Sequence, residues 1–323
     1  MGSFWKDKKV LVTGATGFLG SWLTLELANQ GAEVTTIVHD IVPNSNFYIQ
    51  NLHKKINLIN GSLTDFHTIE RAVNEYAVDT VFHLAAQSQV LVANRSPLST
   101  FEANIKGTWN VLEATRQLGV KRIVVASSDK AYGPQKKLPY FEDTPLSGRF
   151  SYDASKACAD ILAQSYFVTY NLPVGITRCA NLYGGGDYNY DRIIPGTVRS
   201  ILRNEVPIIR SDGTPERDYM YVKDAVNGYL MLAEQLDRKE VMGEAFNMGT
   251  GKGISAKDVV ATIIKMMGKK IEPKILLKEK IKGEIDRQYL ASDKAHKVLG
   301  WKPKYSFENG LKETIAWYKK NLK

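Results

Sequence analysis

Five short apolar runs alternate with amphipathic segments along the first 180 residues. The runs are KVLVTG, AEVTTIV, DTVFHLAA, KRIVVASS and PVGITRCAN, at residues 9–14, 32–38, 79–86, 121–128 and 173–181. Residues 21–30, 66–76 and 106–118 have the spacing of amphipathic helices. Strands that alternate with helices in this way form a parallel sheet with helices on its faces. The sequence therefore predicts an α/β fold with a Rossmann-like, doubly wound parallel sheet.

Length and composition exclude several classes of protein. The chain has 323 residues, of which 44% are hydrophobic, and can bury a large domain with a second lobe. No apolar run approaches the roughly 20 residues of a membrane span, and the start, MGSFWKDKKVLVTG, has no signal-peptide core. We therefore expect a cytoplasmic protein with no membrane partner.

Cys158 and Cys179 lie in helical and strand patterns, which predicts two reduced, buried thiols. The five histidines lack paired metal-ligand spacing, so no metal site is predicted.

The formal net charge of +9 comes from the last part of the chain. Residues 265–323 hold 16 Lys and Arg against 7 Asp and Glu, whereas residues 1–264 balance at 27 against 27. The lysines are spread singly, and no aromatic-rich RNA-binding motif accompanies them. The pattern indicates a solvated surface with one anion-binding edge, and it predicts no nucleic-acid partner.

Three glycines separate the first strand-like run from the next helical segment. Gly14, Gly17 and Gly20 lie between KVLVT and SWLTLELANQG. Glycines there allow a tight turn and the close approach of a pyrophosphate to a helix N-terminus, whose amide dipoles favour negative charge. A glycine trio alone is a weak match. Its place at the first β-to-α crossing predicts a dinucleotide site rather than a purely structural turn.

The end of the second strand influences the choice between NAD and NADP, because a carboxylate there usually binds the adenosine ribose of NAD. The residue 18 places after Gly20 is Val38, and Asp40 comes two places later. A displaced carboxylate could still reach the ribose, whereas a neutral residue with His39 nearby would tolerate the additional phosphate of NADP. The pattern favours NADP and leaves NAD open. A polar loop without cofactor contact is the structural alternative.

The chain divides near residue 180, where Gly and Pro become more frequent and helices mix with short strands. We expect residues 1–180 to form the dinucleotide-binding domain, with a returning segment near residues 218–248. Residues 181–323 are expected to form mainly a smaller, mixed α/β substrate-binding lobe.

Tyr152 and Lys156 begin a helical pattern that continues through Tyr170. A spacing of four puts the phenol and the ammonium on one helix face, where the cation can lower the phenol pKa from about 10 towards neutrality and make it a base. Ser128 ends a predicted strand upstream. With the glycine loop, this trio resembles the extended short-chain dehydrogenase/reductase family over nearly the whole chain. The resemblance implies hydride transfer at a sugar hydroxyl, with these three side chains as catalytic residues and a tightly bound nicotinamide cofactor.

Further blocks are similar to those of nucleotide-sugar 4,6-dehydratases and epimerases. They are FHLAAQ, NIKGTWNVLEA, RCANLYGGGD, RDYMYVKDA and DRQYLASDKAHKVLGW. The resemblance implies that Asn181, Arg217 and Arg287 bind the diphosphate of a sugar nucleotide, because the forked donors of arginine suit a dianion. The structural alternative is a pair of surface arginines whose partners are the adjacent Asp218 and Asp286.

Asp129 and Lys130 follow Ser128 and bear on which activity is present. Simple 4-epimerases usually have small, inert residues there, whereas 4,6-dehydratases carry an acid and a base that remove water across C5 and C6. The SDK sequence, with SKACAD and GGGDYNYDRIIP, is similar to CDP-glucose 4,6-dehydratases, and some UDP-N-acetylglucosamine dehydratases also have Asp-Lys. A lysine base needs a pKa below its reference of about 10.4, which burial beside Lys156 could provide. The alternative is a salt bridge that caps the loop. The DRQY block is closer to dTDP- and UDP-sugar enzymes and leaves the nucleotide open.

The resemblance also completes the predicted site. It implies cofactor contacts at Gly14, Thr16, Gly17, Phe18, Leu19, Gly20, His39, Asp40, Ser62, Leu63, Leu84, Ala85, Ala86, Tyr152 and Lys156. It implies substrate contacts at Gln87, Asn181, Arg192, Arg217 and Arg287. The expected activity is dehydration of a nucleoside-diphosphate hexose, such as UDP-N-acetylglucosamine or CDP-glucose, to a 4-keto-6-deoxy sugar or a related 5,6-elimination product, in deoxysugar biosynthesis. A 4-epimerase and a non-catalytic dinucleotide-sensing protein are the alternatives. Family members commonly pair through two helices, so a homo-oligomer is expected.

Overall fold

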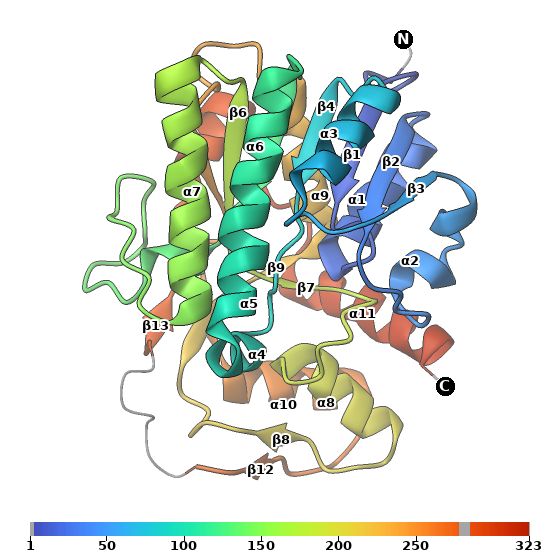
Figure 1. The fold of residues 1–323 in the computed structure, drawn as a ribbon. Helices are drawn as coiled ribbons and strands as arrows, with labels where there is room; N and C mark the ends of the chain where they lie inside the picture. The colour runs from blue at the N-terminus through green and yellow to red at the C-terminus, as the bar shows by residue number, and fades with distance from the viewer. Residues whose placement is uncertain (1–2, 278–284, 323) are drawn as a thin grey trace.

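A seven-stranded parallel sheet forms the centre of the molecule in the computed structural model, which describes residues 3–277 and 285–322 (Figure 1). The strand order is β10-β6-β5-β4-β1-β2-β3. The strands are β1 (Lys9–Thr13), β2 (Glu33–Val38), β3 (Asn57–Asn60), β4 (Thr80–His83), β5 (Arg122–Ala126), β6 (Val174–Cys179) and β10 (Ala245–Met248). Every neighbouring pair in this order is parallel, which confirms the predicted fold class.

Helices cover both faces of the sheet. They are α1 (Phe18–Asn29) and α9 (Val222–Glu234) on one face, and α3 (Phe66–Glu75), α6 (Gly107–Gln117) and α7 (Ser151–Tyr170) on the other. In Figure 1, α6 and α7 stand side by side in front of the sheet. The strand order reverses between β1 and β4, and such a switch point opens a crevice at the carboxyl ends of parallel strands.

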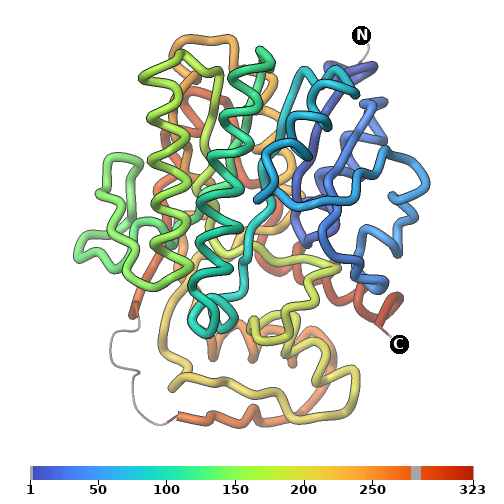
Figure 2. Tube along the Cα trace, in the orientation of Figure 1, coloured from blue at the N-terminus to red at the C-terminus, as the bar shows by residue number. Residues whose placement is uncertain are grey.

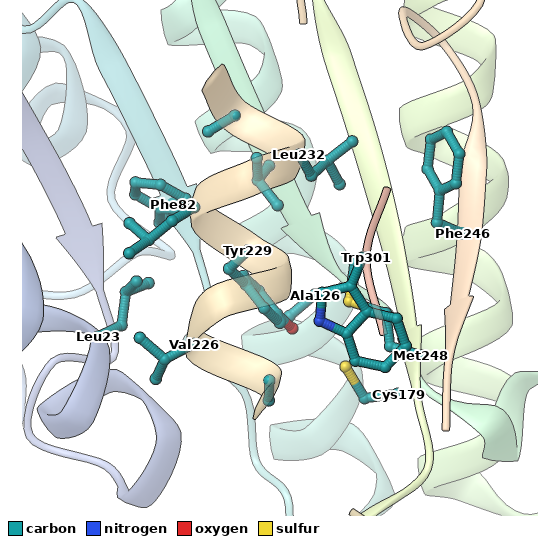
Figure 3. Close-up of a cluster of buried hydrophobic side chains, with 14 of the residues drawn as sticks. Leu23, Phe82, Ala126, Cys179, Val226, Tyr229, Leu232, Phe246, Met248 and Trp301 are labelled. Atoms are coloured by element: carbon teal, nitrogen blue, oxygen red, sulfur yellow. The ribbon is translucent and has the colours of Figure 1, made fainter. Parts of the chain in front are cut away.

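The C-terminal part of the chain returns to complete the core around α9. Leu23, Phe82 and Tyr229 are fully buried there, and Trp301 joins them from near the end of the chain (Figure 3). The Trp301 indole N–H donates to the carbonyl of Asp224 over 3.0 Å, so its polar atom is paired as well as buried. Residues far apart in sequence therefore stabilise one core.

A second lobe lies against the carboxyl ends of the strands. Its helices are α8 (Ile193–Leu202), α10 (Ala256–Met266) and α11 (Phe307–Asn321), and its strands are β7 (Asn181–Tyr183), β8 (Ile208–Ile209), β9 (Glu216–Tyr221), β11 (Gly253–Ser255), β12 (Lys274–Ile275) and β13 (Arg287–Gln288). Figure 2 shows the yellow β8 segment beside the orange β12 segment, which pair in parallel. The lobe has its own apolar cluster, and the cavity lies between this lobe and the central sheet.

Short elements make up the remaining connections. They are α2 (Asn46–Ile49), η1 (Leu52–Lys54), α4 (Val90–Arg95), α5 (Pro97–Phe101), the π-helical turn η2 (Glu102–Lys106), η3 (Asp129–Tyr132) and η4 (Ala295–Leu299). Over the described ranges, we find no helix with the length and apolar character to cross a membrane.

Both cysteines are free thiols, but only Cys179 is buried. The predicted burial of Cys158 is wrong, because this residue lies on the outer surface of α7.

Candidate active site

One large cavity of about 1610 Å³ lies between the sheet and the second lobe. Its lining contains these residues predicted from the sequence: Gly14, Thr16, Gly17, Phe18, Leu19, Gly20, His39, Asp40, Ser62, Leu63, Leu84, Ala85, Ala86, Gln87, Ser128, Asp129, Lys130, Tyr152, Lys156, Asn181, Arg192 and Arg217. Among the predicted site residues, Arg287 alone is outside this lining. The fold therefore brings segments from β1 to β9 into one chamber.

The glycine loop begins this chamber. Gly14 has a φ of +76°, and a Cβ there would lie 2.8 Å from the backbone of Ala85. A Cβ on Gly20 would lie 2.1 Å from the carbonyl oxygen of Gly14, so side chains at either position would push the loop apart. Gly17 is the N-cap residue of α1, and the first residues of that helix line the cavity, so the N-terminus of α1 lies at the cavity wall. These residues fit the pyrophosphate of a dinucleotide.

A buried histidine links this loop to the helices on the other face. Thr108 donates its hydroxyl proton to the carbonyl of Asn104 over 2.6 Å and contacts His83 Nε2 at 2.9 Å. Nε2 therefore carries the proton, and Nδ1 accepts from the Thr13 hydroxyl at 2.8 Å. Burial lowers the pKa of His83 to about 3, so the ring is neutral. The Thr13 oxygen also accepts from the N–H of Ala85, which fixes the cofactor side of the cavity.

Tyr152 and Lys156 lie one turn apart on α7, and both line the cavity. Lys156 Nζ donates to the carbonyl of Ala126 over 2.7 Å, and burial lowers its pKa to about 8. Burial also raises the pKa of Tyr152 to about 12, while Arg192 and a hydrogen bond with Ser128 act in the opposite direction. The predicted fall of the phenol pKa is therefore wrong for the protein alone, because loss of hydration outweighs the effects of Arg192 and Ser128.

Ser128, Asp129 and Lys130 form the turn from β5 into η3. The Ser128 hydroxyl donates to Asp129 Oδ1 over 3.1 Å, and Lys130 Nζ donates to Asp129 Oδ2 over 3.2 Å. The salt bridge considered as an alternative does form, with the Asp129 side chain 4% exposed and that of Lys130 21% exposed. Burial lowers the pKa of Lys130, which confirms the predicted direction; Asp129 opposes this shift, and the assisting cation is Arg217 rather than Lys156.

This geometry joins a glycine loop at a helix N-terminus to a Ser, Tyr and Lys trio and an acid–base pair in one cavity. The family model for GDP-mannose 4,6-dehydratase matches residues 11–314. The chain belongs to this family.

Three relatives show the range of similarity within and around the GDP-mannose 4,6-dehydratase family. A CDP-glucose 4,6-dehydratase from Salmonella typhimurium is 32% identical, with 98% of this chain and 92% of the relative covered. A UDP-glucose 4-epimerase from Thermotoga maritima, solved with UDP-glucose, has a TM-score of 0.88 at 30% identity, with 97% and 99% covered. The dTDP-glucose 4,6-dehydratase DesIV from Streptomyces venezuelae, solved with NAD, has a TM-score of 0.86 at 27% identity, with 97% of each chain covered.

Two buried residues of this family member were missed by the sequence interpretation. Gln288 is fully buried; its Oε1 accepts from Lys130 Nζ at 2.5 Å and its Nε2 donates to the carbonyl of Asp129 at 2.9 Å. Asn104 contacts Ser155 Oγ at 2.8 Å and pairs with the backbone of Gln87 through both its amide atoms. Gln288 therefore positions the turn of Ser128, Asp129 and Lys130, the acid–base turn. Asn104 joins α7 to the loop after β4.

Arg287 occupies the opposite side of the same short strand. Its Nε donates to Glu216 Oε2 over 2.9 Å, and its side chain is 56% exposed. Because side chains alternate along a strand, burying Gln288 against the active site turns Arg287 outward. The structure therefore does not bring Arg287 together with the other predicted site residues. If the DRQY block had been interpreted as a strand, the alternation of its side chains could have indicated that Arg287 and Gln288 face opposite sides.

The second lobe supplies cations and aromatic rings to the cavity. Arg217 donates to the carbonyl of Ile285 over 2.6 Å, and Arg192 donates to Asp187 over 3.1 Å. Asp218 turns away from its neighbour Arg217 and is fully buried, accepting from the N–H and hydroxyl of Thr250. The lobe also contributes lining residues not singled out from the sequence: Tyr188, Tyr190, Arg199, Arg210 and Tyr219.

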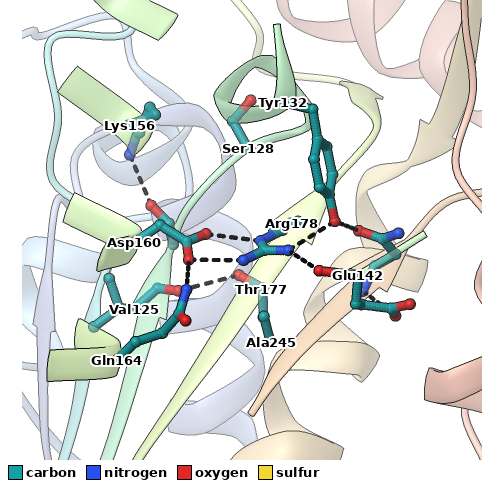
Figure 4. A network of polar contacts seen from close by, with 12 residues as sticks. Val125, Ser128, Tyr132, Glu142, Lys156, Asp160, Gln164, Thr177, Arg178 and Ala245 are labelled. Atoms are coloured by element: carbon teal, nitrogen blue, oxygen red, sulfur yellow. Dashed lines mark hydrogen bonds and ion pairs between the residues drawn. The ribbon is translucent and has the colours of Figure 1, made fainter. Parts of the chain in front are cut away.

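A buried ion pair supports α7 behind Lys156 (Figure 4). Arg178 on β6 donates through Nε and Nη2 to the two carboxylate oxygens of Asp160, at 2.8 and 2.9 Å. Its remaining nitrogen donates to the Tyr132 hydroxyl at 2.9 Å and the Glu142 carbonyl at 2.8 Å. Asp160 also raises the pKa of Lys156, against the larger effect of burial. The network therefore links β6 to α7 and places the Asp160 carboxylate where it acts on the charge of Lys156.

Arg178→Met should lower the free energy of unfolding by about 3–5 kcal/mol, because it leaves the Asp160 carboxylate buried without its partner. Arg116→Met is the matched control: Arg116 makes an equally bidentate pair with Glu113, but its side chain is 36% exposed against 3% for Arg178. The control should change stability far less. Urea denaturation of both variants measures the difference, and equal losses would contradict a role for burial.

Proposed function

We propose that the chain is a nucleoside-diphosphate-sugar 4,6-dehydratase, acting on a hexose such as CDP-glucose or UDP-N-acetylglucosamine or catalysing a related 5,6-elimination. The observation that carries this proposal is the placement of Asp129 and Lys130 in the same cavity lining as Ser128, Tyr152 and Lys156. A carboxyl group and an amine beside the oxidation trio provide the acid and base that loss of water needs. Deoxysugar biosynthesis is the corresponding pathway class.

Each of these residues has a proton task in the proposed reaction. Tyr152 accepts the proton of the 4-hydroxyl. Ser128 is a neighbour of its phenol, and Lys156 is held in the same cavity by its hydrogen bond to the carbonyl of Ala126. Lys130 takes the proton from C5, which the neighbouring C4 ketone acidifies, and Asp129 protonates the departing 6-hydroxyl. The glycine loop and the residues after β4 would hold a nicotinamide cofactor, which would supply the hydride chemistry at C4 and C6.

A 4-epimerase is the second candidate, because the Thermotoga maritima relative solved with UDP-glucose is a UDP-glucose 4-epimerase. Epimerisation requires oxidation and return at C4 but no acid–base pair directed at C5 and C6. The buried Asp129–Lys130 pair, fixed by Gln288, therefore favours dehydration. The intact trio of Ser128, Tyr152 and Lys156 in the cavity disfavours a non-catalytic sensor.

Incubation with CDP-, dTDP-, UDP- and GDP-hexoses, followed by mass spectrometry, tests the proposal. A dehydratase converts at least one of them to a product that has lost water, without added oxidant. In heavy water, the product gains deuterium at C5, because the proton removed there is replaced. A product of unchanged mass, inverted at C4 and without C5 label, would instead establish the epimerase.

We propose NAD as the cofactor, in place of the preference for NADP drawn from the sequence. Asp40 lies in the cavity lining beyond β2, paired with His39 at 3.0 Å, and a carboxylate there suits a ribose hydroxyl and repels an additional phosphate. Asp40→Ala should lower the preference for NAD over NADP by about tenfold or more, the size of one hydrogen bond to a charged group. Equilibrium binding of both dinucleotides to the wild type and Asp40→Ala measures it; Asp237→Ala, at an exposed position outside the cavity lining, is the control. An unchanged preference in Asp40→Ala would contradict the proposal.

We infer that Asn181, Arg192 and Arg217 bind the diphosphate of the substrate. All three line the cavity, and Arg192 is the N-cap residue of α8. Cationic side chains near a helix N-terminus form a favourable environment for a phosphate dianion. Arg287 could join them only after its ion pair with Glu216 opens.

We also propose a homo-oligomer assembled through the outer face of α6 and α7. Trp109, Ile161 and Val168 expose 43%, 54% and 80% of their surface there, and the last two lie seven residues apart on one face of α7. Val168→Glu should convert the oligomer to monomer in sedimentation equilibrium. Leu58→Glu, at a 40% exposed site on β3, is the control and should leave the assembly intact. A wild-type monomer would contradict the proposal.

The proposed division of labour follows the elements. We assign residues 1–180, with the returning segment 218–248, to cofactor binding, because this segment includes α9 and the edge strand β10 of the central sheet. Residues 181–323 are assigned mainly to substrate binding. A cytoplasmic location and the lack of a nucleic-acid partner stay predictions.

A further inference from the structure

The amine of Lys130 is held by two acceptors that come from distant parts of the chain. Its Nζ donates to Asp129 Oδ2 over 3.2 Å and to Gln288 Oε1 over 2.5 Å. Asp129 belongs to the same turn, whereas Gln288 lies on β13, 158 residues further along the chain. A lysine ammonium ends a flexible four-carbon stem, and one contact alone would let it swing. The second contact therefore fixes the direction of the amine.

Gln288 can hold the amine because its own position is fixed. Its side chain is fully buried, and its Nε2 donates to the backbone carbonyl of Asp129 over 2.9 Å. A carbonyl only accepts and a lysine ammonium only donates, so the amide oxygen must face Lys130. The backbone of Gln288 pairs with Arg217 on β9. The acceptor is therefore anchored in the sheet of the second lobe.

The tetrahedral nitrogen of Lys130 has one further position. Besides its bond to Cε, the nitrogen has three positions, and Asp129 and Gln288 take two of them. The third position holds a proton in the ammonium and the lone pair in the free amine. Lys130 lines the cavity, which is where a sugar would meet this third position.

We propose that Gln288 is a positioning residue that directs the lone pair of the Lys130 amine into the cavity, towards C5 of the sugar. The inference rests on the proposed dehydratase function, in which Lys130 removes the C5 proton. The C5–H bond breaks and an N–H bond forms at the third position, while the electron pair left on C5 passes to the C4 ketone as an enolate. Asp129 and Gln288 hold the other two protons of the ammonium throughout this step.

The neutrality of Gln288 suits this task. Burial lowers the pKa of Lys130, and Arg217 adds to this effect. The carboxylates of Asp129 and Asp153 oppose it by favouring the charged form. A neutral amide accepts a hydrogen bond without adding a further negative charge, so it orients the nitrogen and still permits loss of its proton. A carboxylate in its place would favour the ammonium, which cannot act as a base.

The first experiment titrates Lys130 without substrate. Trace acetic anhydride labels only free amines, so mass spectrometry of the labelled peptides against pH gives the pKa of each lysine. Gln288→Met removes the acceptor at nearly constant volume and should lower the pKa of Lys130 by about one unit or more, because a hydrogen bond to a charged group favours that form. The pKa of Lys156, in the same cavity, should not change.

The sign of the shift separates positioning from support of the fold. If Gln288 only supported the fold, its loss would expose Lys130 to water and raise the pKa of the amine. A raised or unchanged pKa of Lys130, or an equal change at Lys156, would overturn the proposal.

Gln235 provides the matched control, because its amide makes the same two kinds of contact away from the site. Its Nε2 donates to the carbonyl of Leu299 over 3.1 Å, and its Oε1 accepts from Arg238. Gln235→Met should leave the labelling curve of Lys130 unchanged. Gln288→Asn places the amide one methylene short of the amine and should also lower the pKa of Lys130. It takes the place of Gln288→Met if that variant fails to fold.

The second experiment uses turnover and tests the direction of the lone pair. It is run at a pH at which Lys130 is a free amine in both the wild type and Gln288→Met. Oxidation at C4 does not use Lys130 and should stay within about threefold, whereas water loss and C5 deuterium exchange should fall about 10²-fold. The 4-keto hexose that keeps its 6-hydroxyl should then accumulate, and sodium borodeuteride traps it for mass spectrometry.

An equal loss in oxidation and water loss would show a general defect of the site and would overturn the proposal. Absence of water loss in the wild type with every sugar would reject the dehydratase itself. The acetylation titration needs no sugar, so it still decides whether Gln288 controls the amine of Lys130.

Discussion

Asp129→Asn combined with Lys130→Ala should lower the rate of water loss by about 10⁴-fold or more, because general acids and bases typically contribute 10²–10⁴ each. The variant should still bind nucleotide sugar and dinucleotide, since both changes remove charge without adding volume. Mass spectrometry of the product, with calorimetric binding of the nucleotide, measures the two effects separately. Deuterium incorporation at C5 in heavy water should disappear together with water loss.

Asp237→Asn with Lys239→Ala makes the same two chemical changes at exposed positions beyond α9 and should leave the rate unchanged. Near-normal turnover by the active-site double variant would remove the dehydratase assignment. Asp129 and Lys130 would then be a loop salt bridge, which their 3.2 Å contact alone is sufficient to form. A product that keeps its 6-hydroxyl and carries no label at C5 would establish epimerisation.

Tyr152→Phe should lower turnover by about 10²–10⁴-fold while leaving nucleotide-sugar affinity nearly unchanged, because the substitution removes the proton acceptor but little volume. Rate and affinity are measured separately by single-turnover product formation and calorimetry. Tyr170→Phe, on the same helix but 55% exposed, is the control and should behave as the wild type.

An equal loss of affinity and rate in Tyr152→Phe would make the phenol a structural contact.

The turnover rate of the wild type should increase with pH throughout the range below the pKa of Tyr152, which burial raises to about 12. The sign follows from the task of the group: deprotonation creates the base, and a raised pKa makes the base scarcer at neutral pH. A rate independent of pH from 6 to 9 would show that another group sets the protonation state.

Periodicity predicted β1, β2, β4, β5 and β6, because each is a short apolar run, but it did not predict the two edge strands, β3 with the polar sequence NLIN and β10 after the returning helix. The run 79–86 became β4, and the helix predicted at residues 66–76 became α3 at Phe66–Glu75. The second lobe could not be predicted in this detail, because its strands are only two to six residues long and pair across large sequence separations. The pairing of Ile208–Ile209 with Lys274–Ile275 depends on tertiary packing rather than on local pattern.

The candidate site was predictable where a motif fixes both residue type and position. The turn from Ser128 to Lys130 and the pair of Tyr152 and Lys156 all line the cavity. Two aspects could not be obtained that way. The register of β13 decides that Gln288 rather than Arg287 faces inward, and the balance between burial and cations sets the pKa of Tyr152. Both are collective properties of the folded chain.

The burial of Gln288 against the acid–base turn has a consequence for the protein during its synthesis. All five proposed catalytic side chains emerge from the ribosome within the first 156 residues, but the amide that holds Asp129 and Lys130 follows more than 130 residues later. Trp301, which seals the core beneath α9, comes later still. Because domains tend to fold as they are translated, a nascent chain can form the glycine loop and α7 while its acid–base turn lacks support. The acid–base turn therefore gains the hydrogen bonds of Gln288 only when translation is almost complete.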